Sequence, residues 1–376
     1  MASRRNTSTL WKGAEKGEIG VFRLLNFVRM KLSVGILGAT GLTGLELMRL
    51  LPRHPQVEIA WLSSESQPGT GYDKVYPAFA GRLPKNVNTL ISVADAHKTA
   101  PDAVFSCLPH AASAAAIEPF LANGKTKVID LSADYRLADL AAYETTYAHK
   151  HPHPSRQAES VYGLTEIHRE RVAQARLVAN PGCYPTSILL PLIPLLREKI
   201  VSPAGIIADS KSGVSGAGKK ATEGTHFYFV NENFSAYKVA GEHRHLPEIA
   251  EQLSLANKSG TGTKVAPVFT PHLVPMERGI LSSIYLDLAP GKTEADAMAA
   301  WQKAYAGSPF VKPLTTLPQT ADVARTNECR FAARRIAGTD KLLVISVIDN
   351  MVKGASGQAL QNFNVMFGLD ETLGLT

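Results

Sequence analysis

Short apolar segments alternate with longer amphipathic stretches over the first half of the chain. Residues 32–37 form one apolar segment, and the turn G-A-T-G-L-T-G (38–44) follows it. The next residues, L-E-L-M-R-L-L, repeat apolar side chains at helical spacing. A strand, a glycine turn and a helix in this order predict the first unit of a βαβ arrangement.

Further apolar segments continue this alternation. We expect strands at 57–63, 103–107, 127–131 and 177–179, separated by helix-like stretches rich in alanine and leucine. Strands that alternate with helices predict an α/β fold with a Rossmann-type, doubly wound parallel sheet.

The pattern changes beyond residue 180, where β-rich segments become longer and helices fewer. Strands are predicted at 205–210, 265–271, 279–288 and 342–348, and the tail at 357–369 has a helical pattern. This pattern predicts a second, α+β domain with a mixed or antiparallel sheet.

The composition of the 376 residues is typical of a soluble globular protein, with 45% hydrophobic and 19% charged residues. The longest apolar run, 188–196, is interrupted by two prolines, whereas a membrane-spanning helix needs about 20 apolar residues. We therefore expect no membrane partner.

More than half of the formal net charge of +7 comes from residues 1–30, which hold six basic and two acidic side chains. The small remaining excess forms no basic run with interleaved aromatic residues, so we expect no nucleic-acid partner. Residues 1–30 are expected to lie outside the fold. They are either a transit segment, against which Glu15 and Glu18 count, or the result of a start upstream of Met30.

Three cysteines, Cys107, Cys183 and Cys329, lie far apart without a C-x-x-C pair. An odd number of cysteines cannot form a complete disulfide framework. A reducing compartment is the natural interpretation, so we expect a cytoplasmic protein in which one of these thiols is free to react.

The glycines of the 38–44 turn have G-x-x-G-x-x-G spacing, a variant of the dinucleotide-binding fingerprint. Without a Cβ, the chain can turn sharply and bring pyrophosphate oxygens to backbone N–H groups at a helix N-terminus. The alternative is a glycine turn that only ends a strand. The strand before it and the helix after it favour a cofactor site.

The residues that end the second predicted strand bear on the choice between NADP and NAD. An NAD enzyme commonly places an acidic residue here to bind the ribose 2′-hydroxyl. This chain has Ser63 and Ser64, whose hydroxyls suit a 2′-phosphate, and Glu65 follows them. The pattern favours NADP and leaves NAD open.

The segment V-A-N-P-G-C-Y-P-T-S carries the most specific chemistry. Cys183 follows an Asn-Pro-Gly turn and precedes a helix that we expect to begin at Pro185. A helix N-terminus favours thiolate over thiol, which predicts a nucleophile. Asn180 or the Cys183 backbone N–H is a candidate donor to a tetrahedral oxyanion. The alternative is a buried structural cysteine; we interpret Cys329 in that way and place Cys107 at a strand end beside the cofactor.

A second constellation is Y-K-V-A-G-E-H-R-H-L-P-E-I. In extended geometry His243 and His245 share one face, while Arg244 points away. No third ligand stands nearby to complete a metal site, so we expect an acid/base histidine. Glu248 is positioned to orient it.

Three further histidines, His149, His151 and His153, lie in a proline-rich connection. They have no other candidate ligands near them in the sequence. We interpret this cluster as a solvated loop.

With these residues in view, the chain resembles the N-acetyl-gamma-glutamyl-phosphate reductases, the arginine-biosynthetic family of the aspartate-semialdehyde dehydrogenase superfamily. The resemblance covers nearly everything from Lys31 to the C-terminus. It rests on seven ordered segments: G-A-T-G-L-T-G-L-E-L, V-I-D-L-S-A-D-Y-R-L, V-Y-G-L-T-E, N-P-G-C-Y-P-T, S-K-S-G-V-S-G-A-G, Y-K-V-A-G-E-H-R-H-L-P-E-I and D-N-M-V-K-G-A-S-G-Q-A.

The resemblance implies roles for individual residues. Cys183 matches the nucleophile, His245 the acid/base group and Glu248 the residue that holds this imidazole. Arg136 matches the position that contacts the phosphoryl group. The other expected substrate contacts are Asn180, Ser212, Tyr237 and His243. The expected cofactor contacts are Gly38, Thr40, Gly41, Leu42, Thr43, Gly44, Ser63, Ser64, Gly213, Ser215, Gly216 and, near the nicotinamide amide, Asn350.

The implied activity is NADPH-dependent reduction of N-acetyl-L-glutamyl 5-phosphate to N-acetyl-L-glutamate 5-semialdehyde and phosphate, through a thioester on Cys183. Sister enzymes that reduce aspartyl phosphate or a carrier-linked aminoadipyl phosphate share this chemistry, and an NADP-binding sensor is the alternative without catalysis. The implied organisation is an NADP-binding domain at 31–180 plus 351–376 and a catalytic and oligomerisation domain at 181–350. A homodimer or homotetramer is expected, without a metal.

Overall fold

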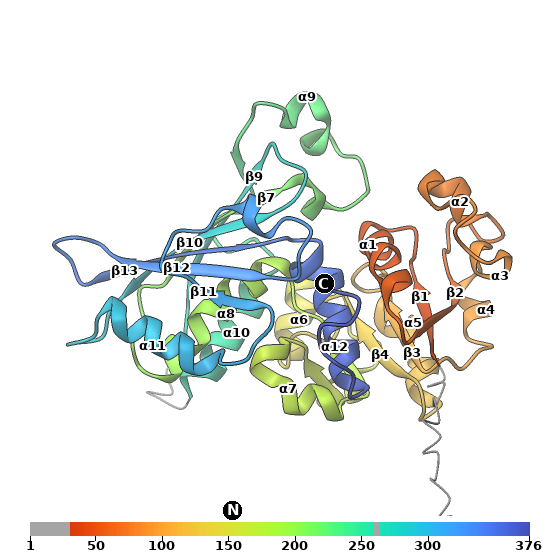
Figure 1. The fold of residues 1–376 in the computed structure, drawn as a ribbon, viewed down its shortest axis with the longest axis horizontal. Helices are drawn as coiled ribbons and strands as arrows, with labels where there is room; N and C mark the ends of the chain where they lie inside the picture. Colours follow the sequence, from red (N-terminus) through yellow and green to blue (C-terminus); the bar gives the residue numbers. More distant parts are fainter. Residues whose placement is uncertain (1–30, 259–263) are drawn as a thin grey trace, which may run out of the picture. The chain divides into compact units, whose positions relative to one another are not determined.

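The computed structural model describes residues 31–258 and 264–376 (Figure 1). The expectation for residues 1–30 lies outside the described residues. Within the described ranges, no helix combines the length and the apolar character needed to cross a bilayer. The strands of these residues form two sheets.

The first sheet has the strand order β2-β1-β3-β4-β6-β5. Every pair of neighbours is parallel, which confirms the predicted Rossmann-type sheet. Strands β2 and β3 flank β1 on opposite sides, so the winding reverses at β1, as in doubly wound folds. The strands are β1 (Leu32–Leu37), β2 (Val57–Leu62), β3 (Ala103–Ser106), β4 (Lys127–Asp130), β5 (Ser160–Tyr162) and β6 (Leu177–Ala179).

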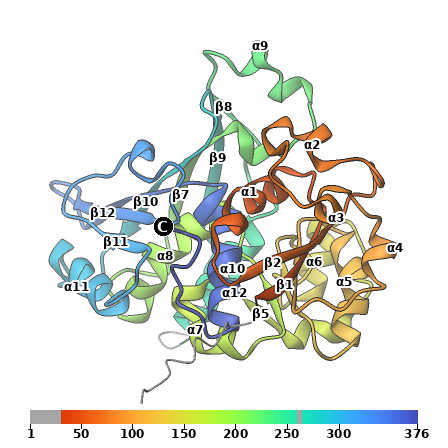
Figure 2. The same cartoon turned by 45° about the vertical axis from the view of Figure 1, so that its right-hand side comes forward.

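Helices connect these strands, and one more helix comes from the C-terminus. The predicted C-terminal helix is found at α12, and a π-helical turn that the sequence pattern did not indicate, η7 (Val352–Ser356), precedes it. Figure 2 shows α12 beside α7. The helices are α1 (Leu42–Leu50), α2 (Tyr72–Val75), α3 (Lys85–Asn88), α4 (Val93–Ala96), α5 (Ser113–Ala122), α6 (Leu140–Tyr147), α7 (Thr165–Gln174) and α12 (Gly357–Met366).

Alternate residues of the first sheet enter different hydrophobic cores, because successive side chains of a strand point to opposite faces. Ile36 of β1 belongs to one core together with Leu47 of α1 and Phe363 of α12. Its neighbour Leu37 belongs to another core together with Phe120 of α5. Burial on both faces explains why these strands are continuous apolar runs in the sequence.

The second sheet has the order β11-β12-β13-β10-β7-β9-β8. Strands β7 and β9 are parallel, as are β11 and β12, and the other pairs are antiparallel. The predicted mixed sheet is therefore confirmed. Its strands are β7 (Ile207–Gly213), β8 (Ser235–Ala236), β9 (Val268–Val274), β10 (Ile280–Asp287), β11 (Val311–Pro313), β12 (Cys329–Arg335) and β13 (Lys341–Ile348).

Three helices, α8 (Cys183–Arg197), α10 (Leu246–Asn257) and α11 (Glu294–Ala304), lie on one side of the second sheet, and the short α9 (Phe227–Val230) rises on the other (Figure 1). Helix α8 is buried over almost its whole length. It begins at Cys183, two residues before the predicted start.

Two prolines lie inside α8, where proline normally breaks a helix. Pro194 has no N–H to donate to the carbonyl of Leu190, and the hydroxyl of Tyr305 donates to that carbonyl instead. The indole N–H of Trp301 donates to the carbonyl of Pro191 at 2.8 Å. The hydroxyl of Tyr305 thus replaces the backbone donor that Pro194 lacks, and Trp301 adds a second side-chain bond at the next residue of the helix.

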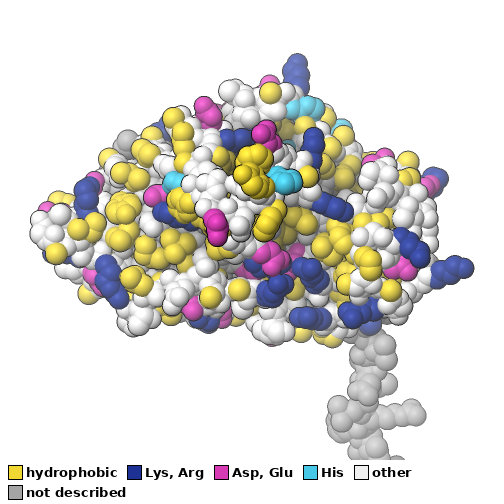
Figure 3. Space-filling model, turned by 90° about the horizontal axis from the view of Figure 1, so that it is seen from above, with side chains coloured by type: hydrophobic (Ala, Val, Ile, Leu, Met, Phe, Trp, Pro, Cys, Tyr) yellow, Lys and Arg dark blue, Asp and Glu magenta, His cyan; other side chains and the backbone are white. Residues whose placement is uncertain are grey.

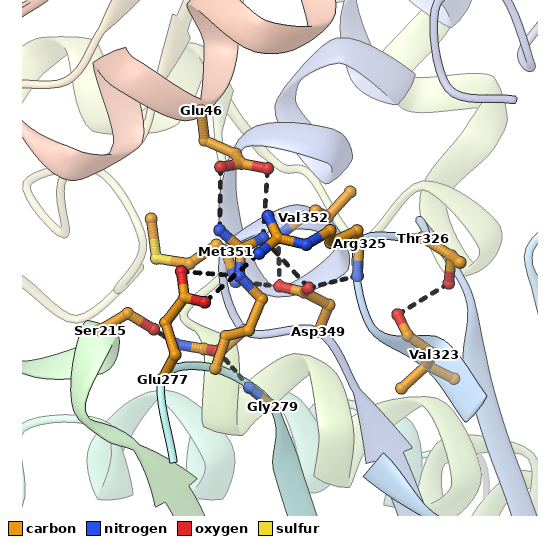
Figure 4. A network of polar contacts seen from close by, with 12 residues as sticks. Glu46, Ser215, Glu277, Gly279, Val323, Arg325, Thr326, Asp349, Met351 and Val352 are labelled. Carbon is orange, nitrogen blue, oxygen red and sulfur yellow. Dashed lines mark hydrogen bonds and ion pairs between the residues drawn. The ribbon is translucent and has the colours of Figure 1, made fainter. Parts of the chain in front are cut away.

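A buried ionic network joins α1 to the second sheet (Figure 4). Arg278, in the turn between β9 and β10, donates to the two carboxylate oxygens of Glu46 at 3.2 and 3.3 Å and to Asp349 at 3.2 Å. These side chains are 7%, 6% and 0% exposed, respectively. Asp349 also accepts from the backbone N–H groups of Arg325 at 2.6 Å and Met351 at 2.8 Å. The network fixes the helix that follows the glycine turn against the second sheet.

We expect Arg278→Ala to lower the free energy of unfolding by about 3–5 kcal/mol, because it leaves the fully buried Asp349 without its cation and Glu46 with only the more exposed Arg49. Urea unfolding followed by circular dichroism measures the change. Lys303→Ala, which breaks the exposed ion pair with Glu198, is the control and should change stability little. Equal stability of the two variants would contradict the assigned role of the network.

Candidate active site

Cys183 is the first residue of α8, directly after β6 and the Asn-Pro-Gly turn. Glycines on either side of it allow unusually close packing. A Cβ on Gly182 would lie 2.7 Å from Nε2 of His245, and a Cβ on Gly354 would lie 2.7 Å from the Cβ of Cys183. The imidazole of His245 therefore lies directly against the residue that precedes the thiol.

A pocket of about 520 Å³ opens at Cys183. Another hollow of about 550 Å³, lined by residues such as Glu166, Arg169 and Asp370, contains no cysteine or histidine, so chemistry rather than size identifies the site. Six predicted site residues line the pocket: Cys183, Ser212, Gly216, Tyr237, His243 and His245. The other lining residues were not assigned a place there from the sequence, and five of them are histidine, tyrosine, lysine or arginine: His110, Tyr147, Tyr184, Lys238 and Arg244.

The two histidines lie side by side, with ring centroids 4.9 Å apart. Their backbone forms turns instead of the predicted extended strand, because α10 begins at the next residue, Leu246. The prediction that Arg244 points away was wrong for the same reason. Arg244 lines the same pocket, and its guanidinium lies 5.6 Å from the ring centroid of Tyr147.

Glu248 does not hold the imidazole as the resemblance implied. Its Oε1 accepts from the hydroxyl of Tyr162 at 2.7 Å and from the backbone N–H of Gly182 at 2.9 Å, and its Oε2 lies 3.4 Å from Arg136. Nδ1 of His245 has no hydrogen-bond partner among the described residues. Glu248 therefore positions the turn that carries Cys183.

Arg136 and Asn180 also lie behind the pocket, whereas the sequence predicted substrate contacts for both. Arg136 is buried, and it donates to the backbone carbonyls of Asn180 at 2.7 Å and Leu131 at 2.8 Å. The side-chain amide of Asn180 donates to the carbonyl of Ala355 at 3.1 Å. The cations that line the pocket are instead Lys238 and Arg244.

Burial raises the pKa of the Cys183 thiol to about 11, although the backbone N–H of Tyr184 and the charge of Arg136 act in the opposite direction. Burial, and then the neighbouring His243 and Arg136, hold the pKa of His245 well below its usual range. At neutral pH the site therefore contains a thiol next to a neutral imidazole. This corrects the expectation that the helix N-terminus favours thiolate over thiol at Cys183.

The structure agrees with the sequence predictions for the other two cysteines but not with the prediction for one of the loop histidines. Cys107 directly follows β3, which confirms its predicted place at a strand end, and its carbonyl lies close to Gly38 of the glycine turn. Cys329 is fully buried, which agrees with a structural role. The solvated-loop prediction was wrong for His151, which is buried with Nε2 2.9 Å from the carbonyl oxygen of Asp134.

The glycine turn has the geometry of a phosphate cradle. Gly38 has φ +72°, and a Cβ there would lie 2.9 Å from the carbonyl oxygen of Cys107. A Cβ on Gly44 would lie 2.7 Å from the Cα of Ala39. The first N–H groups of α1 have no partner inside the helix and suit an anion at this turn. The N-cap and the first helical residues are Gly41, Leu42 and Thr43.

Side chains at the end of β2 also fit a dinucleotide. Ser63 is buried, and its Oγ has no hydrogen-bond partner among the described residues. Oγ of Ser64 lies 3.0 Å from Oγ1 of Thr40 in the glycine turn. Glu65 instead accepts from the backbone N–H of Val93 at 2.5 Å, at the start of α4. The carboxylate of Glu65 is thus bonded to the start of α4, whereas the hydroxyl of Ser64 lies next to the glycine turn.

Asn350 holds the segment 213–216, which contains three of the expected cofactor contacts. Its Oδ1 accepts from the backbone N–H of Gly279 at 2.7 Å, and its Nδ2 donates to Oγ of Ser215 at 3.0 Å. A Cβ on Gly213 would lie 2.8 Å from the carbonyl oxygen of Met276. This segment is therefore packed tightly against the turn between β9 and β10.

The two halves of the fold each match a known family model. Residues 33–175 match the model described as semialdehyde dehydrogenase, NAD binding domain, and residues 183–350 match semialdehyde dehydrogenase, dimerisation domain. The fold and the cysteine–histidine pocket thus define the semialdehyde dehydrogenase class. The NAD binding domain supplies the site for a nicotinamide cofactor.

Among related proteins, an N-acetyl-gamma-glutamyl-phosphate reductase of Geobacter metallireducens is 46% identical over 346 residues, which cover 92% of this chain and 98% of the relative. One of Symbiobacterium thermophilum is 47% identical over 349 residues, with the same coverage. The chain belongs to the N-acetyl-gamma-glutamyl-phosphate reductase family.

Solved structures confirm the fold. The aspartate semialdehyde dehydrogenase II of Vibrio cholerae has a TM-score of 0.65 at 17% identity, covering 90% of this chain and 99% of that one. The aspartate semialdehyde dehydrogenase of Candida albicans has a TM-score of 0.61 at 18% identity, covering 90% and 98%.

We expect alkylation of Cys183 by iodoacetamide to accelerate steadily from pH 6 to pH 10. A pKa above the ordinary value keeps the thiol protonated at neutral pH, and the reactive thiolate fraction grows as the pH rises. Mass spectrometry of the peptide that contains Cys183 measures the rate. A plateau reached by pH 7 would show that the free protein already holds a thiolate.

Proposed function

We propose that this protein reduces N-acetyl-L-glutamyl 5-phosphate to N-acetyl-L-glutamate 5-semialdehyde and phosphate, with NADPH as the reductant. The observation that carries this proposal is the thiol of Cys183 at the mouth of α8, beside a neutral imidazole in a pocket that also contains two cations. Two relatives that are 46% and 47% identical to this chain, over 98% of their own length, are named N-acetyl-gamma-glutamyl-phosphate reductase.

The pocket suits a substrate with several negative charges. Lys238 and Arg244 line it together with His110, whose pKa burial lowers to about 3. The two cations attract the phosphoryl and carboxylate groups, while the imidazole of His110 stays neutral. This distribution of charge holds an acyl phosphate with its carbonyl group toward the thiol.

Cys183 and His245 carry out the first step. The imidazole takes the proton of the thiol, and the sulfur attacks the acyl carbon. The bond between this carbon and the phosphate oxygen breaks, and His245 passes its proton to the departing oxygen. The acyl group remains on Cys183 as a thioester.

The bound nicotinamide cofactor supplies the hydride that reduces the thioester carbonyl. The resulting oxyanion lies at the N-terminus of α8, where backbone N–H groups stabilise negative charge. When the carbonyl re-forms, the carbon–sulfur bond breaks and the semialdehyde leaves. The thiolate of Cys183 then takes up a proton from solvent.

NADP rather than NAD is the proposed cofactor. The carboxylate of Glu65 accepts from the N–H of Val93 at the start of α4, which leaves it less free to accept from a ribose 2′-hydroxyl, the contact typical of NAD. The unpartnered hydroxyl of Ser63 and the hydroxyl of Ser64 are available as donors at the end of β2. We place this cofactor in a domain made of residues 31–180 and 351–376, with residues 181–350 as the catalytic domain.

A homodimer is also proposed, through the side of the second sheet opposite α8, α10 and α11. Half-buried side chains of β10 and β13 line this face, including Leu281, Tyr285, Leu343 and Ile345. Figure 3 looks onto it from above and shows hydrophobic side chains spread over it. A second copy of the chain would bury this face, in keeping with the family model described as a dimerisation domain.

The reaction is tested with Cys183→Ser, which we expect to lose at least about 10³-fold in turnover because a hydroxyl is a much weaker nucleophile. Cys329→Ser is the control, because Cys329 is buried away from the pocket and should affect only stability. Turnover is followed as phosphate-dependent NADP reduction by the semialdehyde, and NADPH binding should persist in both variants.

The substrate is tested in the same assay with three semialdehydes: those of N-acetylglutamate, aspartate and carrier-linked aminoadipate. A preference for the first supports the proposal. A preference for either of the others identifies a sister activity, and NADPH binding without turnover of any of them identifies a sensor.

The dimer is tested by light scattering after size-exclusion chromatography. Leu281→Arg places a charge on the proposed interface and should shift the protein toward the monomer. Leu255→Arg, on the exposed side of α10, is the control and should leave the mass unchanged. A wild-type monomer, or a Leu281→Arg variant of unchanged mass, would contradict the proposed surface.

A further inference from the structure

A lysine of the second half of the chain contacts the glycine turn of the first. Lys219 follows the short 3-10 turn Val214–Ala217, in the segment that leads to α9, which Figure 2 shows next to α1 and α2. Its Nζ donates to the carbonyl oxygen of Thr40 at 3.2 Å and lies 3.2 Å from the hydroxyl of Tyr76. The same ammonium lies 4.7 Å from the ring centroid of Tyr76.

Tyr76 strengthens this contact and fixes its place. Its hydroxyl donates to the carbonyl of Thr40 at 2.8 Å, so two donors meet at one oxygen of the glycine turn. Thr40 is the residue before Gly41, the N-cap of α1. The ammonium of Lys219 thus lies at the turn whose following N–H groups suit a phosphate.

The charge of Lys219 is only partly compensated. Among the described residues it forms no ion pair with a carboxylate, whereas Lys353 lies 2.7 Å from Oε1 of Glu166. A carbonyl oxygen and an aromatic face attract a cation more weakly than an anion does. An anion that reaches the glycine turn therefore provides a better partner for this ammonium than the present ones.

We propose that Lys219 is a phosphate-binding residue of the cofactor site and that it pairs with the pyrophosphate of the nicotinamide dinucleotide. The ammonium exchanges the carbonyl of Thr40 for a pyrophosphate oxygen and keeps its contact with the ring of Tyr76. This inference rests on the nicotinamide cofactor of the proposed function. It adds a contact from the catalytic half of the chain to a site otherwise built by the first half.

The position of Lys219 links cofactor binding to the catalytic pocket. Gly216, Ala217 and Thr222, on either side of Lys219 in the sequence, line the pocket at Cys183. When Lys219 pairs with the cofactor, the segment 216–222 is held over the dinucleotide. The same contact then fixes one wall of the substrate pocket.

The test is a fluorescence titration of NADPH with the wild-type protein and three variants. Lys219→Met keeps the apolar part of the side chain and removes the charge, and we expect it to weaken NADPH binding about tenfold or more, the loss typical of a charged hydrogen bond. Lys219→Arg should recover most of the affinity. Lys220→Met removes the same charge from the next residue, which is also exposed, and should bind like the wild type.

NADH, measured in the same way, identifies the phosphate. A similar fold-loss for NADH and NADPH in Lys219→Met supports the pyrophosphate contact. A loss confined to NADPH would overturn it and move the contact to the 2′-phosphate. Unchanged NADPH affinity in Lys219→Met, or an equal loss in Lys220→Met, would overturn the proposal even where the wild-type protein binds NADPH and turns over. A wild-type protein that binds neither nucleotide would refute the proposed function as well.

Discussion

The geometry of the site depends on one buried carboxylate, that of Glu248. It accepts from the backbone N–H of Gly182 and the hydroxyl of Tyr162 and lies beside the guanidinium of Arg136. A buried carboxylate is tolerated only when its lone pairs and charge are satisfied, so these partners cannot move independently. Arg136 in turn holds the carbonyl of Asn180 at the end of β6. A residue of α10 and a residue beyond β4 thereby fix the turn that presents the thiol, although neither reaches the pocket.

Two opposing effects act on the thiol in this fixed position. The N-terminus of a helix stabilises an anion by about 0.3–1 kcal/mol at an exposed site and by up to ~2 kcal/mol in a partly buried one. Burial raises the pKa of Cys183 from 9.0 to about 11, and each pKa unit corresponds to about 1.4 kcal/mol. Burial therefore outweighs the helix. The neighbouring imidazole of His245, itself kept neutral by burial and nearby cations, is the group that accepts the proton in the proposed first step.

Much of the fold follows from local pattern, whereas the contacts behind the site do not. Strands buried on both faces, such as β1 and β3, are apolar runs that the sequence shows directly. Strand β12 was missed because its sequence, C-R-F-A-A-R-R, places arginines on the half-exposed side of the second sheet. Cys183 and His245 were found because short motifs mark them. The real partners of Glu248 and Arg136 could not be found in this way, because these residues are separated by 112 positions and meet only when α10 packs beside α8.

Two connections of different physical character join the glycine turn and α1 to the second half of the chain. Arg278 bonds to Glu46 and Asp349 with all three side chains almost fully buried, and breaking such a network leaves uncompensated charges in a low dielectric. It is therefore a fixed attachment of α1. Lys219 is exposed and holds only a carbonyl and a ring, so its partners can be exchanged at little cost. The proposed pairing of Lys219 with the cofactor would therefore let the segment 216–222 respond to the cofactor, while the rigid attachment at Glu46, in the middle of α1, keeps this helix in place.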